Sequence, residues 1–122
     1  MPKFAFNVIK NDKIFEIAVN GFFQEEDAKQ FLEGYSTNVK SFNPKEYSLI
    51  VDASKMSIIK ADLTSGLEQC FKLYMSTGFK KIIIITPEDV IEKMQFERLS
   101  KDVNLNADLV INREEAIKIA KS

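Results

Sequence analysis

The sequence predicts an α/β fold: a single domain spanning residues 1–122, in the order ββαβαβαβα, with a mostly parallel central sheet, an opening hairpin and covering helices. Three observations lead to this prediction. Residues 82–85 are four consecutive isoleucines, a run typical of a strand that is buried on both faces inside a parallel sheet. Strand-like and helix-like segments alternate after residue 24. The length of 122 residues, 45% of them hydrophobic, suits one core.

The expected strands follow from short apolar segments. Apolar side chains alternate with polar or small ones in the first two strands, and the turn at Asn11-Asp12 joins them into a hairpin that Gly21 ends. A third apolar run ends in Asp52, which predicts a buried strand that delivers a carboxylate at its carboxyl end. We expect strands over residues 4–8, 14–19, 47–51, 81–86 and 108–111, with the opening strand at an edge of the sheet.

The expected helices follow from apolar positions spaced three and four residues apart. Acidic residues open the first helix, Asn43-Pro44 breaks it, and Gly78 closes the second. Pro87 is expected to start the third helix, and Asn112 to cap the fourth. We expect helices over residues 24–39, 63–77, 87–99 and 113–120.

Composition excludes several functions. Without any histidine, the chain cannot use Ser-His-Asp or Cys-His catalysis, a histidine-ligated zinc or a histidine switch. The single cysteine, Cys70, cannot form an internal disulfide or a thiolate metal cluster, and on the apolar face of the second helix we expect it to be an inert core residue. We therefore expect no metal and no cofactor.

Charge and hydropathy narrow the expected partners. Seventeen basic and eighteen acidic side chains give a net charge of -1 with no block of like charges, so we expect no nucleic-acid partner. The first residues lack a signal peptide, and no run approaches the roughly 18 apolar residues of a membrane helix. We therefore expect a cytoplasmic protein without a membrane partner.

Residues 50–56 (IVDASKM) form the end of an expected strand and the loop after it, and residues 62–67 (DLTSGL) form the start of the next helix. These two segments and the order of elements resemble the STAS family, which includes anti-sigma factor antagonists, stressosome components and cytoplasmic domains of sulfate transporters. In that family the helix after the loop opens with a serine that is phosphorylated. Two alignments are open. One places Ser65, or Thr64, at the phosphorylation position; the other, made without a gap, places residues 60–62 there, which offer no hydroxyl. The second alignment fits divergent members that keep the fold and lose the serine.

The resemblance implies a docking surface on the segment from Asp52 to Gly66 and the helix that follows. This segment is expected at the carboxyl edge of the sheet, where open α/β folds bind their partners. The candidate partner-binding side chains are Asp52, Ser54, Lys55, Ser57, Lys60 and Asp62. A phosphate on Ser65 or Thr64 would add nearly two negative charges to that surface.

Structural roles compete with these functional ones. Asp62 could simply be the N-cap of the second helix, with Thr64 and Ser65 filling its first turn. Asp52 could hydrogen-bond amides of its own loop rather than a ligand. The adjacent pair Phe22-Phe23 could fill the core, or leave one ring exposed for docking.

A nucleotide site at the strand-to-helix junction 86–89 is rejected, because the junction has no glycine, Pro87 has no amide donor, and two carboxylates follow it. The sequence thus predicts a protein-interaction module that is not an enzyme and needs no catalytic residues. Asp52 with Lys60 is the only nearby pair worth testing for catalysis. The alternative is a carrier of a small apolar ligand, such as a fatty acid, between the sheet and its helices.

Overall fold

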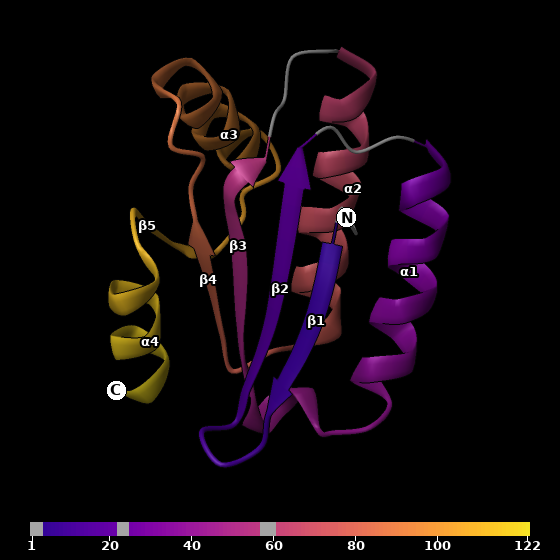
Figure 1. The fold of residues 1–122 in the computed structure, drawn as a ribbon, viewed down its shortest axis with the longest axis vertical. Helices are drawn as coiled ribbons and strands as arrows, with labels where there is room; N and C mark the ends of the chain where they lie inside the picture. Colours follow the sequence, from indigo (N-terminus) through magenta and orange to yellow (C-terminus); the bar gives the residue numbers. More distant parts are fainter. Residues whose placement is uncertain (1–3, 22–24, 57–60) are drawn as a thin grey trace.

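The computed structural model describes residues 4–21, 25–56 and 61–122, without the side chains of residues 25, 26, 28 and 61–67. It contains a five-stranded sheet in which neighbours in sequence are neighbours in space, in the order β1-β2-β3-β4-β5 (Figure 1). β1 pairs with β2 in an antiparallel hairpin at one edge, and the other three pairings are parallel. The strands are β1 (Phe4–Ile9), β2 (Ile14–Gly21), β3 (Ser48–Met56), β4 (Lys81–Ile85) and β5 (Asp108–Val110). The predicted order of strands and helices is confirmed.

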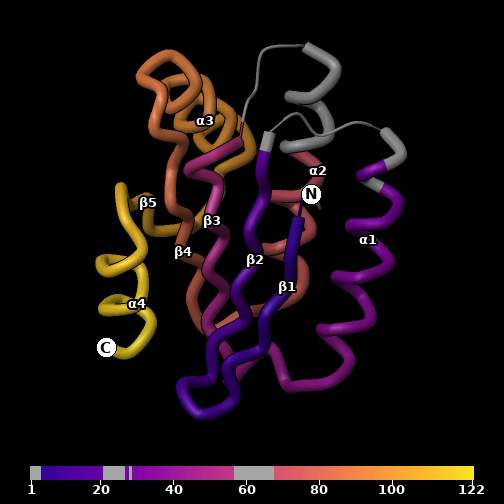
Figure 2. Tube along the Cα trace, in the orientation of Figure 1, coloured from indigo at the N-terminus to yellow at the C-terminus, as the bar shows by residue number. Residues whose placement is uncertain are grey.

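The strand order decides where the helices lie. The chain passes from β2 to β3, then to β4 and to β5, and each time it moves one strand along the sheet in the same direction. Because these parallel connections are right-handed crossovers, the helices within the three connections all lie on one face of the sheet. The fourth helix follows β5 and returns along the opposite face, against β3, β4 and β5. Figure 2 follows the chain from the hairpin at one edge to this helix at the other. The helices are α1 (Glu25–Val39), α2 (Ala61–Thr77), α3 (Val90–Asp102) and α4 (Arg113–Lys121), with a short 3-10 turn, η1 (Pro44–Glu46).

The isoleucine run is an interior strand, as predicted. β4 lies between β3 and β5 and is parallel to both. Side chains alternate across a strand, so Ile82 and Ile84 join the core under α1, α2 and α3, whereas Ile83 and Ile85 join the core under α4. None of the four is more than 9% exposed. Burial of each such side chain contributes roughly 1.5–3 kcal/mol to folding.

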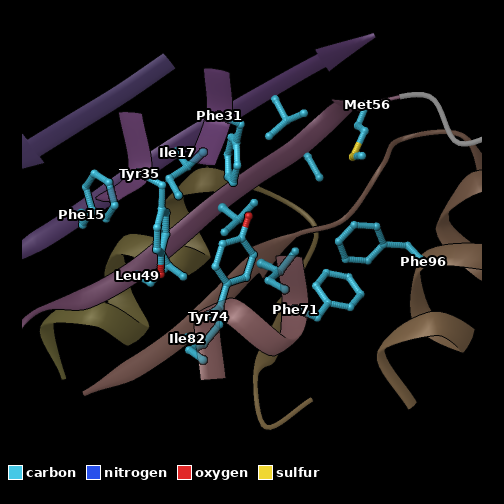
Figure 3. Packing of buried hydrophobic residues seen from close by; sticks show 14 of the residues in the cluster. Phe15, Ile17, Phe31, Tyr35, Leu49, Met56, Phe71, Tyr74, Ile82 and Phe96 are labelled. Atoms are coloured by element: carbon cyan, nitrogen blue, oxygen red, sulfur yellow. The ribbon is translucent and has the colours of Figure 1, made fainter. Parts of the chain in front are cut away.

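The larger core is aromatic (Figure 3). Phe15, Phe31, Phe71 and Phe96 come from four different elements and are each at most 1% exposed. Their rings contact others at distances typical of favourable pairs, such as the edge-on contact of Phe71 with Phe96 at 5.1 Å between centroids. This packing joins α1, α2 and α3 to the sheet.

Two glycines have specific roles. Gly78 follows α2 with φ of 85°, a left-handed conformation that closes the helix as predicted. Gly34 lies inside α1, where a Cβ atom would come within 2.6 Å of a ring carbon of Phe6. The missing side chain therefore lets α1 approach β1 closely.

Two predicted boundaries are wrong, for identifiable reasons. β3 continues past Asp52 to Met56, because β2 remains beside it and supplies backbone partners as far as Gly21. α3 begins at Val90 rather than at Pro87, because the carboxylate of Asp89 accepts hydrogen bonds from the amides of Ile91 and Glu92 and caps the helix there. Phe22 and Phe23 lie outside the described residues.

Candidate partner-binding site at the end of β3

The last residues of β3 begin the predicted docking segment, which the structure describes again at residues 61–66, without their side chains. β3 has nine residues and β4 has five, and Asp52 is the last β3 residue that pairs with β4. The pairing with β2 shifts by one residue just beyond it, because Ala18 pairs with Asp52 but Asn20 pairs with Lys55. One extra β3 residue is therefore accommodated in a β-bulge. Bulges redirect side chains at the ends of strands, and this one lies at the carboxyl edge of the sheet.

Asp52 braces this bulge. Its Oδ1 accepts hydrogen bonds from the backbone amide of Ser54 at 3.1 Å and from the Ser54 hydroxyl at 2.6 Å. This is the bracing role that the sequence offered as an alternative to ligand binding, although the braced segment is a strand and not the expected loop. Both side chains are half-buried, so each keeps some exposure to solvent.

Lys55 and Ser54 connect β3 to the segment before α3. The amide of Glu88 donates to the carbonyl oxygen of Ser54 at 3.2 Å, and the Lys55 ammonium lies 3.2 Å from a Glu88 carboxylate oxygen. Both charged side chains are about two-thirds exposed, at 66% and 65%. Such a pair contributes little to stability, on the order of 0–1 kcal/mol. Lys55 is thus available to exchange Glu88 for an acidic group on a partner.

Asp52 also has charged neighbours that the sequence analysis missed. The guanidinium of Arg113, at the start of α4, binds the Glu16 carboxylate through two contacts, at 2.7 and 3.1 Å. Glu16 raises the pKa of Arg113 by hydrogen bonding and charge, and Asp52 raises it further. The Glu16 side chain is only 13% exposed, so its charge is largely removed from water and is balanced by Arg113.

Only the strand register could have revealed that Glu16, Asp52 and Arg113 lie together. Glu16 and Asp52 each lie two residues after an isoleucine of the smaller core, Ile14 and Ile50, so both face the α4 side of the sheet. Arg113 is 97 residues from Glu16 in the sequence, and no motif links them.

The remaining predicted site residues are described in part or not at all. Ser57 and Lys60 lie outside the described residues. Asp62, Thr64 and Ser65 lie in the first turns of α2, and their side chains are not described. Because α2 begins at Ala61, Asp62 lies inside the helix, and the alternative role as its N-cap is wrong.

Cys70 has the properties expected of a core residue. Its side chain packs against the larger core, and burial raises the pKa of the thiol to about 11. Burial similarly raises the pKa of the nearby Tyr35 hydroxyl to about 12, and that hydroxyl hydrogen-bonds to Thr77 at 2.7 Å. At neutral pH the thiol is therefore protonated and a poor nucleophile.

Two hollows lie at the opposite edge of the sheet. One, of about 360 Å³, is lined by apolar atoms of Met75, Phe79 and Ile82 and by Lys80 and Lys81. The other, of about 550 Å³, lies between the end of α3 and Leu109. Both adjoin the amino ends of β4 or β5, away from the predicted docking segment. Within the described ranges, no three acidic or cysteine side chains gather as a metal site would require.

The fold is that of the STAS family, also called SpoIIAA-like. An uncharacterised protein of the DUF3478 family from Shewanella loihica, described as having a SpoIIAA-like fold, matches 98% of this chain over 95% of its own, with a TM-score of 0.71 and 11% identity. The anti-sigma factor antagonist SpoIIAA in its unphosphorylated form matches 98% of both chains, with a TM-score of 0.63 and 12% identity. RsbS of Moorella thermoacetica matches 96% of this chain over 93% of its own, with a TM-score of 0.69 and 15% identity.

These likenesses confirm the predicted resemblance at the level of the fold, and at such low identities they show the fold alone. No family model matches the sequence, and neither does any curated protein. Among the described residues, no helix is both long enough and apolar enough to cross a membrane.

Proposed function

We propose that this chain is a cytoplasmic, non-enzymatic regulatory module that docks a protein partner through residues 52–66 and the exposed side of α2. The observation that carries the proposal is the end of β3, where a braced bulge presents Lys55 at the carboxyl edge of a STAS-like sheet. Anti-sigma factor antagonists share this fold. A protein partner requires only a shaped and charged surface, which agrees with a chain that contains no histidine.

Lys55 offers the most direct test. Its exposed ammonium should pair with an acidic partner group, so Lys55→Glu should weaken capture of a partner from native lysate, and Lys60→Glu should do the same. Lys45→Glu is the matched control, because Lys45 is also exposed but lies in η1, before the first residue of β3. Loss of one captured protein from both variants, with retention by the control, is the expected result. Equal recovery by all four proteins would reject the docking surface.

The phosphorylation candidates deepen the same proposal. A phosphate on Ser65 or Thr64, in the first turns of α2, would add nearly two negative charges within the docking segment and alter partner affinity. Intact-mass measurement of protein from its native host should show one added phosphate, located in residues 61–67 by fragmentation. Ser65→Asp should change capture of the partner, whereas Ser76→Asp, at the exposed far end of α2, should not. If the protein from its native host carries no phosphate, and Ser65→Asp and Ser76→Asp capture the partner equally well, the alignment that places no hydroxyl at the phosphorylation position is favoured.

One observation favours the second candidate function, a carrier of a small apolar ligand. The 360 Å³ hollow combines the apolar side chains of Met75, Phe79 and Ile82 with Lys80, which suits an apolar chain ending in a carboxylate, and Asp108 also lines it. Native mass spectrometry of gently purified protein should then show added mass, lost after Phe79→Ala. Spectra without added mass from several preparations would remove this candidate without affecting the docking proposal.

A further inference from the structure

Lysines gather at the amino edge of the sheet, although they are scattered along the sequence. Four segments meet at this edge: the turn between β1 and β2 (residues 10–13), the connections from α1 to β3 (40–47) and from α2 to β4 (78–81), and the end of α4 (117–122). Each segment carries two lysines and no arginine. Against these eight lysines, the four segments contain two acidic side chains, Asp12 and Glu46.

Hydrogen bonds join these segments to one another. The amide of Lys80 donates to the carbonyl oxygens of Pro44 and Tyr47, at 3.3 and 2.9 Å. The amide of Ser48, the first residue of β3, donates to the carbonyl oxygen of Lys13 at 3.0 Å. The turn and both connections lie together at the lower end of the molecule in Figure 1. Their lysines therefore belong to one continuous surface.

Two of the eight lysines are engaged within the protein. The Lys81 ammonium donates to the carbonyl oxygen of Ile119 at 2.9 Å and to two oxygens of Ser122, and the Lys121 ammonium lies 3.6 Å from the Asp12 carboxylate. The other six are exposed, and none of them forms an ion pair with the described residues. We call these six the lysine edge: Lys10, Lys13, Lys40, Lys45, Lys80 and Lys118.

We propose that the lysine edge binds the surface of an anionic membrane. Its side chains come from the hairpin at one side of the sheet, from two connections and from α4, so they spread over one whole end of the molecule. A flat surface can contact all of them at once. Lysine is a strongly hydrated point charge that suits such adsorption, whereas recognition of bases and phosphates in nucleic acids favours the planar fork of arginine. The four segments contain no arginine.

The remaining charges agree with this orientation. Carboxylates of the opposite edge, such as Glu114 and Glu115 at the start of α4, are separated from the lysine edge by the length of the sheet. The nine residues of β3 span about 25–30 Å, which is about three Debye lengths at physiological salt. The membrane would therefore hardly repel them. The connection from α3 to β5 also reaches the amino edge but adds no positive charge, because Lys101 is followed by Asp102 and Asp108.

Binding in this orientation leaves the docking segment accessible. Residues 52–66 begin at the carboxyl edge of the sheet, opposite the lysine edge, so a membrane-bound module would present them to a partner in solution. A surface contact of this kind needs no membrane-spanning segment. Along the chain the lysines occur at most in adjacent pairs, so counting charges in the sequence did not reveal the surface. The inference stands apart from the proposed function, because the two surfaces share no residue.

Vesicle co-sedimentation tests the lysine edge. Wild-type protein should bind vesicles of phosphatidylcholine with about one-third phosphatidylserine, but not vesicles of phosphatidylcholine alone. Binding should weaken as the salt concentration rises from about 0.05 M to about 0.3 M. Lys45→Glu and Lys80→Glu should each weaken binding about 5- to 30-fold, because each reverses one charge at the membrane surface. Lys55→Glu makes the same charge change at the opposite edge, so it is the matched control and should bind vesicles like wild type.

The variants also separate this inference from the docking proposal, since Lys55→Glu should impair only partner capture and Lys45→Glu only vesicle binding. Circular dichroism should show that every variant keeps the wild-type fold. A wild-type protein that ignores phosphatidylserine vesicles at low salt would overturn the inference, and so would equal vesicle binding by Lys45→Glu, Lys80→Glu and Lys55→Glu. A mixed-sequence DNA duplex is the competing polyanion. Tighter binding to the duplex than to vesicles, at equal concentrations of anionic charge, would reject the membrane and indicate nucleic acid.

Discussion

Replacement of Gly34 by alanine tests how closely α1 packs on β1. A Cβ at this position would lie 2.6 Å from the Cε2 atom of Phe6, about 0.8 Å short of the 3.4 Å at which ordinary contact begins. The Phe6 ring cannot easily yield, because it contacts Phe4, Phe15 and Phe31 at 5.5–5.9 Å between centroids. Overpacking of this kind costs about 1–3 kcal/mol. The helix itself would gain about 1 kcal/mol from exchanging glycine for alanine.

We therefore expect Gly34→Ala to lower the free energy of unfolding by about 0–2 kcal/mol, measured by urea denaturation. The sharper expectation is that the effect of Gly34→Ala on the free energy of unfolding changes sign when the Phe6 ring is removed. In a Phe6→Ala background the ring is gone, so Gly34→Ala should raise the free energy of unfolding by about 1 kcal/mol through helix propensity alone. The reasoning is refuted if Gly34→Ala stabilises both backgrounds equally, since the ring would then impose no constraint.

Three further predictions concern the core, the buried thiol and the ion pair. Ile84→Ala, in the interior strand, should cost about 2–5 kcal/mol in unfolding free energy, whereas Ile111→Ala, at a side chain that is 63% exposed, should change it by less than about 0.5 kcal/mol. Because burial raises the pKa of Cys70 from 9.0 to about 11, the folded state retains the thiol proton that the unfolded chain releases. Stability should therefore fall as the pH rises from 9 towards 11, and Cys70→Ala should lessen that fall; equal pH profiles would show that the thiol does not contribute. Arg113→Ala should cost about 1 kcal/mol because it leaves the mostly buried Glu16 unpaired, and the loss should largely vanish in a Glu16→Gln background; additive effects would mean that the two side chains do not interact.

Much of the fold could be predicted because local patterns agree with the final packing. The isoleucine run required burial on both faces, and only an interior strand between helical layers provides this. Gly78 and Asn112 were predicted to end and to begin helices from their own backbone and side-chain chemistry, which needs no distant partner. The STAS-like resemblance followed from the same order of elements.

The predicted end of β3 and the predicted start of α3 are wrong for one shared reason. In each case a hydrogen-bond partner that is distant in sequence, or that competes with another residue, sets where the element ends or begins. β3 runs on beyond Asp52 because β2 continues beside it, and the strand pattern of residues 47–51 carries no sign of this. The start of α3 at Val90 was missed because Pro87 and Asp89 are both suitable residues for a helix start. In the structure the Asp89 carboxylate accepts hydrogen bonds from the first amides of α3, so the helix begins after Asp89. The exposure of Val90, Ile91 and Met94 was also hidden, because these side chains are as apolar as core residues.

By itself, the sequence of this protein determined the alternation of strands and helices, the interior position of β4 and the absence of histidine chemistry. These depend on side-chain type and on spacing along the chain. Only the tertiary structure decided that Glu16, Asp52 and Arg113 share one face, that Lys55 pairs with Glu88, and that three apolar side chains of α3, Val90, Ile91 and Met94, point into water. Such facts depend on strand register and on which side of a helix meets the sheet. Those are set by the packing of the whole chain, because a single residue's shift in register moves a side chain to the opposite face.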